Sequence, residues 1–216
     1  MRVVIAGGHG KIAMELTRLL DERGDQVRSL IRNPDHADEV RAAGALEAIV
    51  CDLEESSPDR VAEATGEADV IVFAAGAGPG SGPERKETMD YGGVVKLLDA
   101  AAHNGIGRFV VISSMGADPD HEGDETFDVY LRAKGRADAA IRESGLDYLI
   151  VKPGRLTDDP PRGAVEAGES VDRGQIPRAD VAAVIATLLG DSAADRTIEV
   201  VGGDTPIEGL AEALPR

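Results

Sequence analysis

Short apolar runs alternate with amphipathic stretches along the first 153 residues. Six runs rich in β-branched residues stand at 2–6, 26–31, 46–50, 69–75, 108–114 and 148–153. Between them, apolar residues recur at helical spacing in 11–23, 35–43, 84–104 and the segment that carries Tyr130. This alternation predicts βαβ units that build a parallel sheet with at least six strands.

A different pattern follows residue 153. Residues 155–163 (RLTDDPPRG) are typical of a turn-rich loop, and residues 164–174 (AVEAGESVDRG) predict a small hairpin. A helix near 179–190, a strand at 196–201 and a short terminal helix are expected after it. No linker, repeat or low-complexity tract separates these parts. The 216 residues therefore predict one α/β domain with a small C-terminal hairpin and helix extension.

Composition limits the classes of partner. A net charge of -17 repels phosphate backbones and acidic lipid surfaces, which argues against nucleic acid and membrane partners. No apolar segment reaches the roughly 20 residues that cross a bilayer, and a strand that starts at Arg2 leaves no room for a signal peptide. We expect a cytoplasmic protein, monomeric or homodimeric, in which the single cysteine, Cys51, is a buried structural thiol.

Glycines follow the first strand directly. Gly7, Gly10 and Ala13 form a GxxGxxA arrangement that ends a strand and opens a helix. Small residues let the backbone turn tightly and approach a pyrophosphate, and the helix N-terminus offers unpaired N–H groups, here around Ile12. The alternative is a tight turn that binds nothing. His9, inside the loop, either touches a phosphate or is an exposed loop side chain.

The end of the second strand indicates which dinucleotide binds. Folds that prefer NAD usually place an acid there, to accept from the ribose 2'-hydroxyl. This chain has Arg32, whose guanidinium suits a 2'-phosphate, with Lys11 and Asn33 nearby to assist. The sequence therefore predicts NADP (NADPH) as cofactor, against the alternative that Arg32 is simply solvent-exposed.

Residues after the third and fourth strands fit the rest of a dinucleotide. Asp52 and Leu53 are candidates to bond and cover an adenine, and Ala74, Ala75 and Gly76 let a ribose lie against the backbone. The alternatives are that Asp52 caps a turn and that the alanines pack the core.

With the segments GGHGKIA, SLIRNP, FAAGAG, VVISSMGA, YLRAK and VKPGRL in that order, the chain resembles the short-chain dehydrogenase/reductase superfamily. It is most similar to the atypical short members, which include NAD(P)-binding proteins, sugar epimerases and flavin/biliverdin-type reductases. The likeness covers the first six strands and continues into the helix IPRADVAAVI. It implies a Rossmann-type doubly wound parallel sheet, with residues 154–216 contributing part of the substrate pocket.

The resemblance also implies roles for individual residues. The family's reactive tyrosine falls on Tyr130, its lysine on Lys134 and its serine on Ser114, whereas its asparagine position holds Asp90. This last departure puts the family's usual proton-relay path in doubt.

By the same resemblance, a second group of residues lies at the cofactor. Pro153 would stand beside the nicotinamide, Gly154 and Arg155 close to the cofactor or substrate, and Ser113 with the cofactor.

The chemistry gives a reason for these residue types. A free tyrosine has a pKa of about 10 and is a poor acid at neutral pH until a neighbouring ammonium favours its phenolate. Lys134, one helical turn from Tyr130, can do this and can also donate to the nicotinamide ribose, while Ser114 holds a substrate carbonyl. The alternative is a solvated helix face.

We therefore predict an NADPH-dependent oxidoreductase for a small carbonyl or related acceptor. Two other functions stay open: a non-catalytic NADP-binding redox sensor, and an epimerase or dehydratase that retains its nicotinamide. Only about sixty residues follow Pro153, which leaves little chain to grip a nucleotide sugar.

The remaining polar residues predict no metal site. His36, His103 and His121 lack ligand-type spacing. The acidic loop at 118–128 lacks the pattern of a calcium loop, and we expect a mobile lid beside the substrate pocket, with Phe127 lining that pocket or fixing the helix start.

Overall fold

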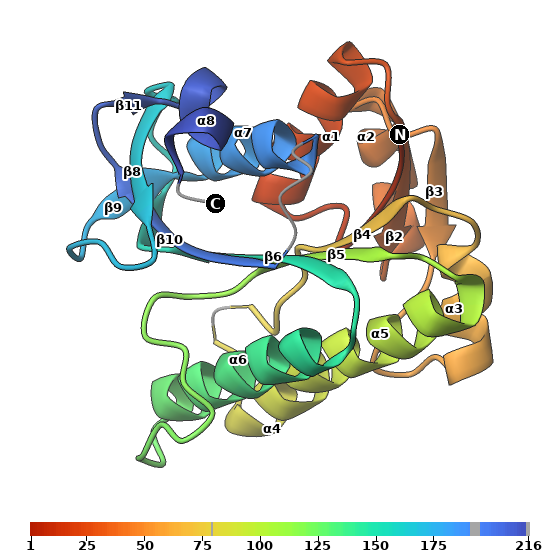
Figure 1. Ribbon diagram of the computed structural model, residues 1–216. Coiled ribbons are helices and arrows are strands. Elements are labelled where there is room, and N and C mark those ends of the chain that lie inside the picture. The colour runs from red at the N-terminus through yellow and green to blue at the C-terminus, as the bar shows by residue number, and fades with distance from the viewer. Residues whose placement is uncertain (79, 191–194, 215–216) are drawn as a thin grey trace.

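The computed structural model describes residues 1–78, 80–190 and 195–214, and its centre is a nine-stranded sheet (Figure 1). The strand order is β11-β8-β10-β6-β5-β4-β1-β2-β3. The first six strands are β1 (Arg2–Ala6), β2 (Gln26–Ile31), β3 (Glu47–Val50), β4 (Val70–Phe73), β5 (Arg108–Ile112) and β6 (Asp147–Pro153). All pairings among these six are parallel, which confirms the predicted parallel sheet.

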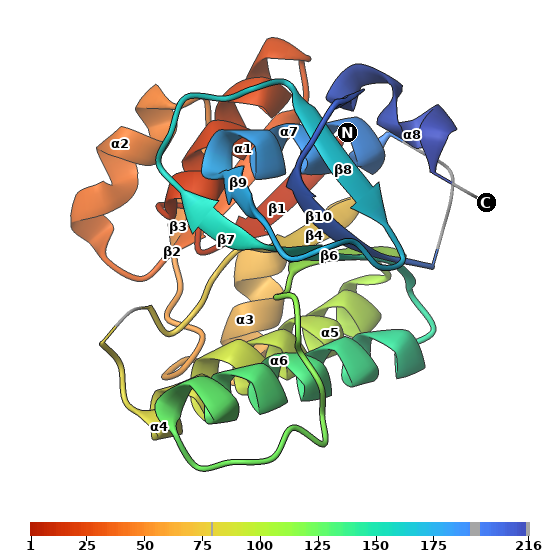
Figure 2. The same ribbon diagram turned by 90° about the vertical axis from the view of Figure 1, so that its left-hand side faces the viewer.

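Helices cover both faces of the sheet, as Figures 1 and 2 show. One face carries α1 (Lys11–Glu22), α2 (Ala37–Ala42), α7 (Arg178–Leu189) and α8 (Leu210–Ala213). The other face carries α3 (Pro58–Thr65), α5 (Gly92–Asn104) and α6 (Thr126–Glu143). The doubly wound arrangement predicted from the sequence is therefore confirmed.

The apolar runs are nearly continuous because each strand is buried on both faces. In β1, Val3 and Ile5 pack in the cluster that contains α1, whereas Val4 and Ala6 pack in the cluster that contains α5. These four side chains are almost wholly buried. Alternation along the strand thus divides one apolar segment between two cores.

The chain after β6 differs from its prediction. The strands β8 (Ala164–Gly168) and β9 (Gln175–Pro177) do not form the expected hairpin. Instead β8 pairs antiparallel with β10 (Arg196–Gly202) and β11 (Thr205–Pro206), while β9 pairs in parallel with β7 (Arg155–Thr157). The hairpin prediction is wrong because the partners of β8 come from a distant part of the sequence. The segment 155–163, expected to be a loop, starts with β7.

The predicted helix over 84–104 is interrupted. It consists of α4 (Pro83–Arg85), a π-helical segment (Lys86–Tyr91) and α5. π-helical turns are rare and occur frequently at functional sites. This one buries Lys86, Met89 and Asp90 on the side of the sheet that α6 also covers.

Several short elements complete the chain. The expected helix at 35–43 forms as a 3-10 turn (Pro34–His36) followed by α2, and the terminal helix as a 3-10 turn (Ile207–Gly209) followed by α8. The helix α3 lay outside the predicted elements, although its cap is readable: Ser57 Oγ accepts from the Arg60 amide at 3.3 Å, with Pro58 in the first turn.

Two further expectations concern burial and membranes. Cys51 is a buried free cysteine, as predicted, and its Sγ lies 3.7 Å from Ser56 Oγ. Within the described ranges, every helix is too short or too polar to pass through a bilayer.

The packing of α6 on the preceding loop leads to a stability prediction. A Cβ on Gly135 would lie 2.1 Å from the carbonyl carbon of Asp118 and 2.2 Å from the nitrogen of Pro119. Gly135→Ala must push this backbone away, so we expect the free energy of unfolding to fall by about 1–3 kcal/mol, partly offset by about 0.5–1 kcal/mol of helix propensity. Urea denaturation measures the change.

Gly107→Ala is the control, because no heavy atom of the described residues lies within 4 Å of a Cβ at Gly107. Equal stabilities for both variants would contradict the packing described for Gly135.

Candidate functional site

Two adjoining cavities lie where the strand order reverses. β1 pairs with both β2 and β4, and in sheets of this kind ligands bind at the carboxyl ends of the strands at such a point. The β2 cavity, of about 360 Å³, is lined by residues that follow β1, β2, β3 and β4. The α6 cavity, of about 620 Å³, is lined by residues of the π-helical segment, β5 and α6. Both cavities share Gly10 and residues 74–78.

The glycine loop is pressed onto its neighbours. Gly7 has φ +78°, and a Cβ there would lie 2.6 Å from Ala75 Cα. A Cβ on Gly8 would lie 2.6 Å from Ser29 Cβ. The amides of Gly7 and Gly8 both donate to Leu30 O, at 3.1 and 3.0 Å. Only glycine fits at these two positions, and the prediction had not singled out Gly8.

The loop leaves the start of α1 open. Gly10 is the N-cap of α1 and contributes no side-chain cap, while its own amide donates to Gly7 O at 2.8 Å. The amides of the first helical turn have no acceptor within the helix and point toward its N-terminus. Together with the helix dipole, they form a site for an anion such as a diphosphate. Ile12, in this turn, also lines the α6 cavity.

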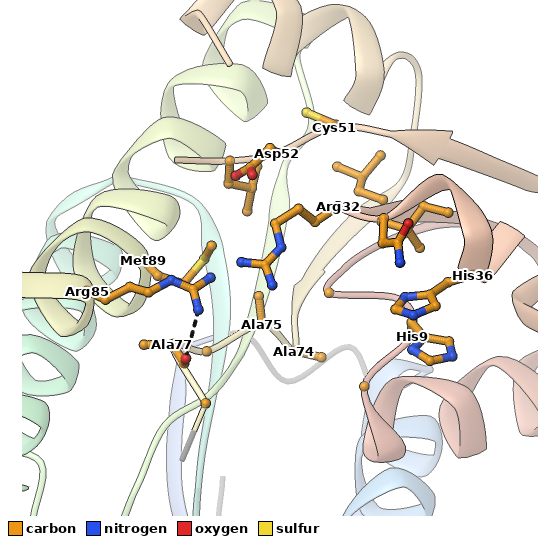
Figure 3. Close-up of a pocket in the computed structure, with 18 residues that line it drawn as sticks. His9, Arg32, His36, Cys51, Asp52, Ala74, Ala75, Ala77, Arg85 and Met89 are labelled. Carbon is orange, nitrogen blue, oxygen red and sulfur yellow. Dashed lines mark hydrogen bonds between the residues drawn. The ribbon is translucent and has the colours of Figure 1, made fainter. Parts of the chain in front are cut away.

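Two guanidinium groups enter the β2 cavity from opposite sides (Figure 3). Arg32, whose side chain is 58% exposed, extends from the end of β2, with Nη1 4.0 Å from Glu54 Oε2. Arg85 comes from α4; its Nε donates to Glu54 Oε2 at 2.8 Å and its Nη1 to Ala77 O at 3.1 Å. Arg85 was not predicted, because nothing in the sequence connects α4 with the end of β3.

Glu54 lies between these two arginines. Burial alone would raise its pKa, but hydrogen bonds from Arg85 and Thr88 and the charges of Arg85 and Arg32 outweigh burial and lower the pKa below the ordinary value of 4.5. Glu54 is therefore ionised at neutral pH and fixes the Arg85 side chain at the cavity.

The other predicted residues of the β2 cavity lie in its lining and also bond locally. Asp52 Oδ1 accepts from the Glu54 amide at 2.9 Å, and Asn33 Oδ1 accepts from the Asp35 amide at 3.1 Å. Leu53 is buried. Residues 74–76 form the boundary with the α6 cavity.

Of the two predicted polar residues around the glycine loop, His9 lies in the β2 cavity and Lys11 lies outside it. His9 lines the β2 cavity, stacks on His36 at 3.6 Å between ring centroids, and its Nε2 lies 2.8 Å from Glu39 Oε2. Lys11 Nζ instead donates to Asp158 at 2.6 Å, and Lys11 lies outside the lining of both cavities. His36 was not among the predicted site residues.

Tyr130, Lys134 and Asp90 meet in the α6 cavity. Tyr130 and Lys134 are one turn apart on α6, with Lys134 Nζ 6.0 Å from the Tyr130 ring centroid. Lys134 is only 3% exposed; its Nζ donates to Ile112 O at 2.9 Å and lies 3.4 Å from Asp90 Oδ1. Asp90 Oδ2 accepts from the Ala77 amide at 3.3 Å. The structure thus brings together three of the four predicted catalytic residues.

The two serines after β5 face different ways. Ser113 lines the α6 cavity, and its Oγ donates to Asp138 Oδ2 at 3.0 Å. Ser114 lies outside that lining, and its Oγ donates to Met115 O at 3.2 Å. Side chains alternate along a strand, so Ser113 shares the α6 side with Val111. The alternation of side chains along β5 could therefore have shown, from the sequence, that Ser113 and Ser114 face opposite sides of the sheet.

Asp138 was also missed by the sequence reasoning. It lies one turn beyond Lys134 on α6, is 1% exposed, and its Oδ2 lies 3.1 Å from Lys152 Nζ. Burial raises its pKa and outweighs the opposing effects of Lys152 and Ser113. The spacing of Tyr130, Lys134 and Asp138, four residues apart each time, could have identified it.

Residues 153–155 do not line either cavity. The Gly154 amide donates to Val200 O at 2.9 Å, and a Cβ on Gly154 would lie 2.5 Å from Gly174 O. Pro153 is buried, Arg155 is exposed and its amide bonds to Gly174 O, so packing accounts for this segment. Leu156 is the residue of β7 that reaches the α6 cavity.

The acidic loop is bonded to α6. Arg132 Nη1 donates to His121 O at 2.8 Å and to Gly123 O at 3.0 Å, and His121 lies 3.0 Å from Asp128. Its last part reaches the cavity: Phe127, 63% exposed, lines the α6 cavity and stacks on Tyr130 with ring centroids 5.9 Å apart.

Comparison with known proteins agrees with this geometry. Residues 7–192 match the family model described as NAD(P)H-binding. The uncharacterized sugar epimerase YhfK of Bacillus subtilis is 37% identical over 218 residues, covering 100% of both chains. A Bacillus halodurans structure, provisionally described as an NAD-dependent epimerase/dehydratase, is 38% identical with a TM-score of 0.91, covering 99% of this chain and 100% of that one.

A further solved structure is the oxidoreductase ylbE from Lactococcus lactis, which is 26% identical with a TM-score of 0.85. The likeness covers 99% of this chain and 96% of that one.

The Glu54 cluster leads to a prediction of pH dependence. Because its pKa is lower in the folded protein, Glu54 stabilises the fold fully above pH 4.5, and this contribution is lost as pH falls through the folded pKa. Glu54→Gln should lower the free energy of unfolding by about 1 kcal/mol at pH 7, and the difference from the parent should shrink below pH 4.5. Urea denaturation at several pH values measures it.

The exposed neighbour Glu55 supplies the control, Glu55→Gln. A Glu54→Gln deficit that persists unchanged in acid would contradict the ionic role of Glu54.

Proposed function

We propose that this chain, which belongs to the NAD(P)H-binding family, is an NADP(H)-dependent oxidoreductase that acts on a small carbonyl or related acceptor. One observation carries the proposal. The α6 cavity, with Tyr130 and Lys134, adjoins the glycine loop through shared residues 74–78, so that one dinucleotide can reach from the loop to the tyrosine.

The described residues fit such a cofactor. Glycine at positions 7 and 8 lets the loop pack closely against Ala75 and Ser29, and the amides at the start of α1 suit a diphosphate. The adenosine would lie beside Asp52 and Leu53 in the β2 cavity. Oδ1 of Asp90 is buried and has no hydrogen bond among the described residues, so it can accept from a donor in the α6 cavity, such as a ribose hydroxyl. The cofactor supplies the hydride.

The guanidinium groups favour NADP over NAD. Arg32 and Arg85 place two permanent positive charges in the β2 cavity, where a 2'-phosphate would add negative charge. Glu54 offsets part of this charge but is bonded to Arg85, so Arg32 is the more available of the two.

Tyr130 is the proposed acid. Its hydroxyl would give a proton to the acceptor oxygen while hydride arrives at carbon, and the Lys134 ammonium offsets the negative charge that then forms on the phenol. Asp90 keeps the buried Lys134 charge compensated. Of the two serines, we propose Ser113 as the polar group at the acceptor, in place of Ser114, because only Ser113 lines the cavity.

The C-terminal part of the chain shapes the pocket. Leu156 supports the proposal that residues 154–216 contribute to the substrate site. The α6 cavity, about 620 Å³, would also hold the nicotinamide, which favours a small acceptor. A cytoplasmic location and a monomeric or homodimeric state stay predictions from the sequence.

A second candidate is an epimerase or dehydratase. The names of the Bacillus subtilis and Bacillus halodurans relatives favour it. Such an enzyme would retain its nicotinamide between turnovers, so cofactor should co-purify and survive dialysis. A redox sensor, in contrast, would bind NADPH reversibly and consume none with small aldehydes, ketones and quinones.

Substitution of Arg32 tests the choice of cofactor. Arg32→Gln should weaken NADPH binding about tenfold, because a charge-assisted bond to the 2'-phosphate is lost, and should change NADH affinity little. Fluorescence titration with both nucleotides measures this. Arg41→Gln, on the surface of α2, is the control. Comparable affinities of the parent for NADPH and NADH would rule out the role given to Arg32.

Substitution of Tyr130 tests the chemistry. Tyr130→Phe should lower turnover of small carbonyl compounds by a factor of at least about 100, the usual contribution of a general acid, with NADPH affinity retained. NADPH consumption followed by absorbance measures turnover. Tyr148→Phe, in β6, is the control. An unchanged rate in Tyr130→Phe would remove Tyr130 from the mechanism.

A further inference from the structure

Lys86 is a buried lysine in the lining of the α6 cavity. It begins the π-helical segment and is 8% exposed. Its Nζ donates to Gly78 O at 2.9 Å and lies 5.5 Å from the ring centroid of Tyr130. The tyrosine is thus flanked by two ammonium groups, of Lys86 and Lys134.

Lys86 differs from Lys134 and from the half-buried Lys152 in its partners. Burial of an ammonium is costly unless an opposite charge compensates it. Lys134 has Asp90 at 3.4 Å and Lys152 has Asp138 at 3.1 Å. Within the part of the chain that the structure describes, no carboxylate lies within 4.0 Å of Lys86. Among the described residues its one hydrogen-bond acceptor is the Gly78 carbonyl, which leaves two of its three N–H donors for a ligand.

We propose that Lys86 binds a carboxylate of the substrate. Two free donors on one ammonium match the two oxygens of a carboxylate, and the missing negative charge would then arrive with the ligand. Because Lys86 lies beside Tyr130, the carboxylate must be only a few bonds from the carbonyl that receives the proton. The substrate class is therefore a small 2-oxo or 3-oxo acid.

The apolar side chains of the α6 cavity indicate what group the substrate carries on the other side of its carbonyl. Phe127 lies next to Tyr130, and Leu156 and Ile12 contribute apolar surface. An apolar or aromatic group on the far side of the carbonyl would be buried against these side chains. The inference rests on the proposed reductase function, in which hydride from NADPH reduces the carbonyl carbon, the proton of Tyr130 goes to the oxygen, and NADP⁺ and a hydroxy acid result.

Benzoylformate and its methyl ester form a matched pair of probes. They share the ketone and the phenyl ring and differ in the negative charge. The parent should reduce the acid with a kcat/KM at least about tenfold above that of the ester, the effect expected of one charge-assisted contact. Lys86→Met should remove this preference chiefly by raising KM for the acid, and Lys86→Arg should retain it.

Two kinetic outcomes overturn the proposal. The first is that the parent protein reduces the ester with the same kcat/KM as the acid. The second is a Lys86→Met variant that loses both activities in equal proportion, because this would assign Lys86 to Tyr130 rather than to the substrate. Lys96→Met, a lysine that bonds to carbonyls of residues 53–56 outside the α6 cavity, is the control.

A binding measurement separates this inference from the proposed function. Calorimetry of the NADP⁺-loaded protein with benzoate and benzamide requires no turnover. Benzoate should bind the parent and bind Lys86→Met at least about tenfold more weakly, whereas benzamide should not distinguish them. If the protein reduces neither benzoylformate nor its methyl ester but binds benzoate in a Lys86-dependent way, the proposed reductase function is refuted and the carboxylate site is retained. Benzoate binding that is absent or insensitive to Lys86 would refute the site.

Discussion

The close approach of the β1–α1 loop to β2 and β4 is the constraint on which the site depends. Gly7 lies against Ala75 and Gly8 against Ser29, at distances that exclude a Cβ. This contact places the start of α1 at the sheet edge where both cavities meet. A side chain at either position would lift the loop, and the amides of the first helical turn would no longer border the shared wall at residues 74–78. The anion site and the position of the cavities thus have one structural cause.

In and beside the α6 cavity, most buried charged side chains are paired with opposite charges. On α6, Lys134 and Asp138 lie one turn apart, and each is matched by a partner from elsewhere, Asp90 and Lys152. Asp90, the partner of Lys134, is a buried residue of the π-helical segment. The same segment carries Lys86, whose charge has no such match among the described residues. One local irregularity therefore supplies both a compensating carboxylate and a cation available to a ligand.

Patterns within one element were readable from the sequence, whereas pairings between distant elements were not. The apolar runs predicted the six parallel strands, and the glycines after β1 predicted the loop. The carboxyl ends of β2, β3 and β4 identified most of the β2 cavity, because parallel strands end at one edge. The strand partners of β8, the ion pair of Arg85 with Glu54 and the position of Lys86 depend on tertiary packing, and no local pattern encodes them. Ser113 is an intermediate case. The alternation of side chains along β5 predicts that it faces α6, but the family resemblance pointed to Ser114 as the catalytic serine.

The charge of the site opposes that of the whole molecule. The chain carries a net charge of -17, yet the two cavities are lined by four cations, Arg32, Arg85, Lys86 and Lys134, and two carboxylates, Asp52 and Asp90. At physiological ionic strength, exposed charges act over about 8 Å, so the distant acidic surface is largely screened at the cavities. Lys86 and Lys134 are buried and Arg85 is partly buried, so these three are less screened than Arg32, whose side chain is 58% exposed. Selection of an anionic cofactor and an acidic substrate would therefore arise from short-range contacts inside the cleft, because a surface of net negative charge does not attract anions.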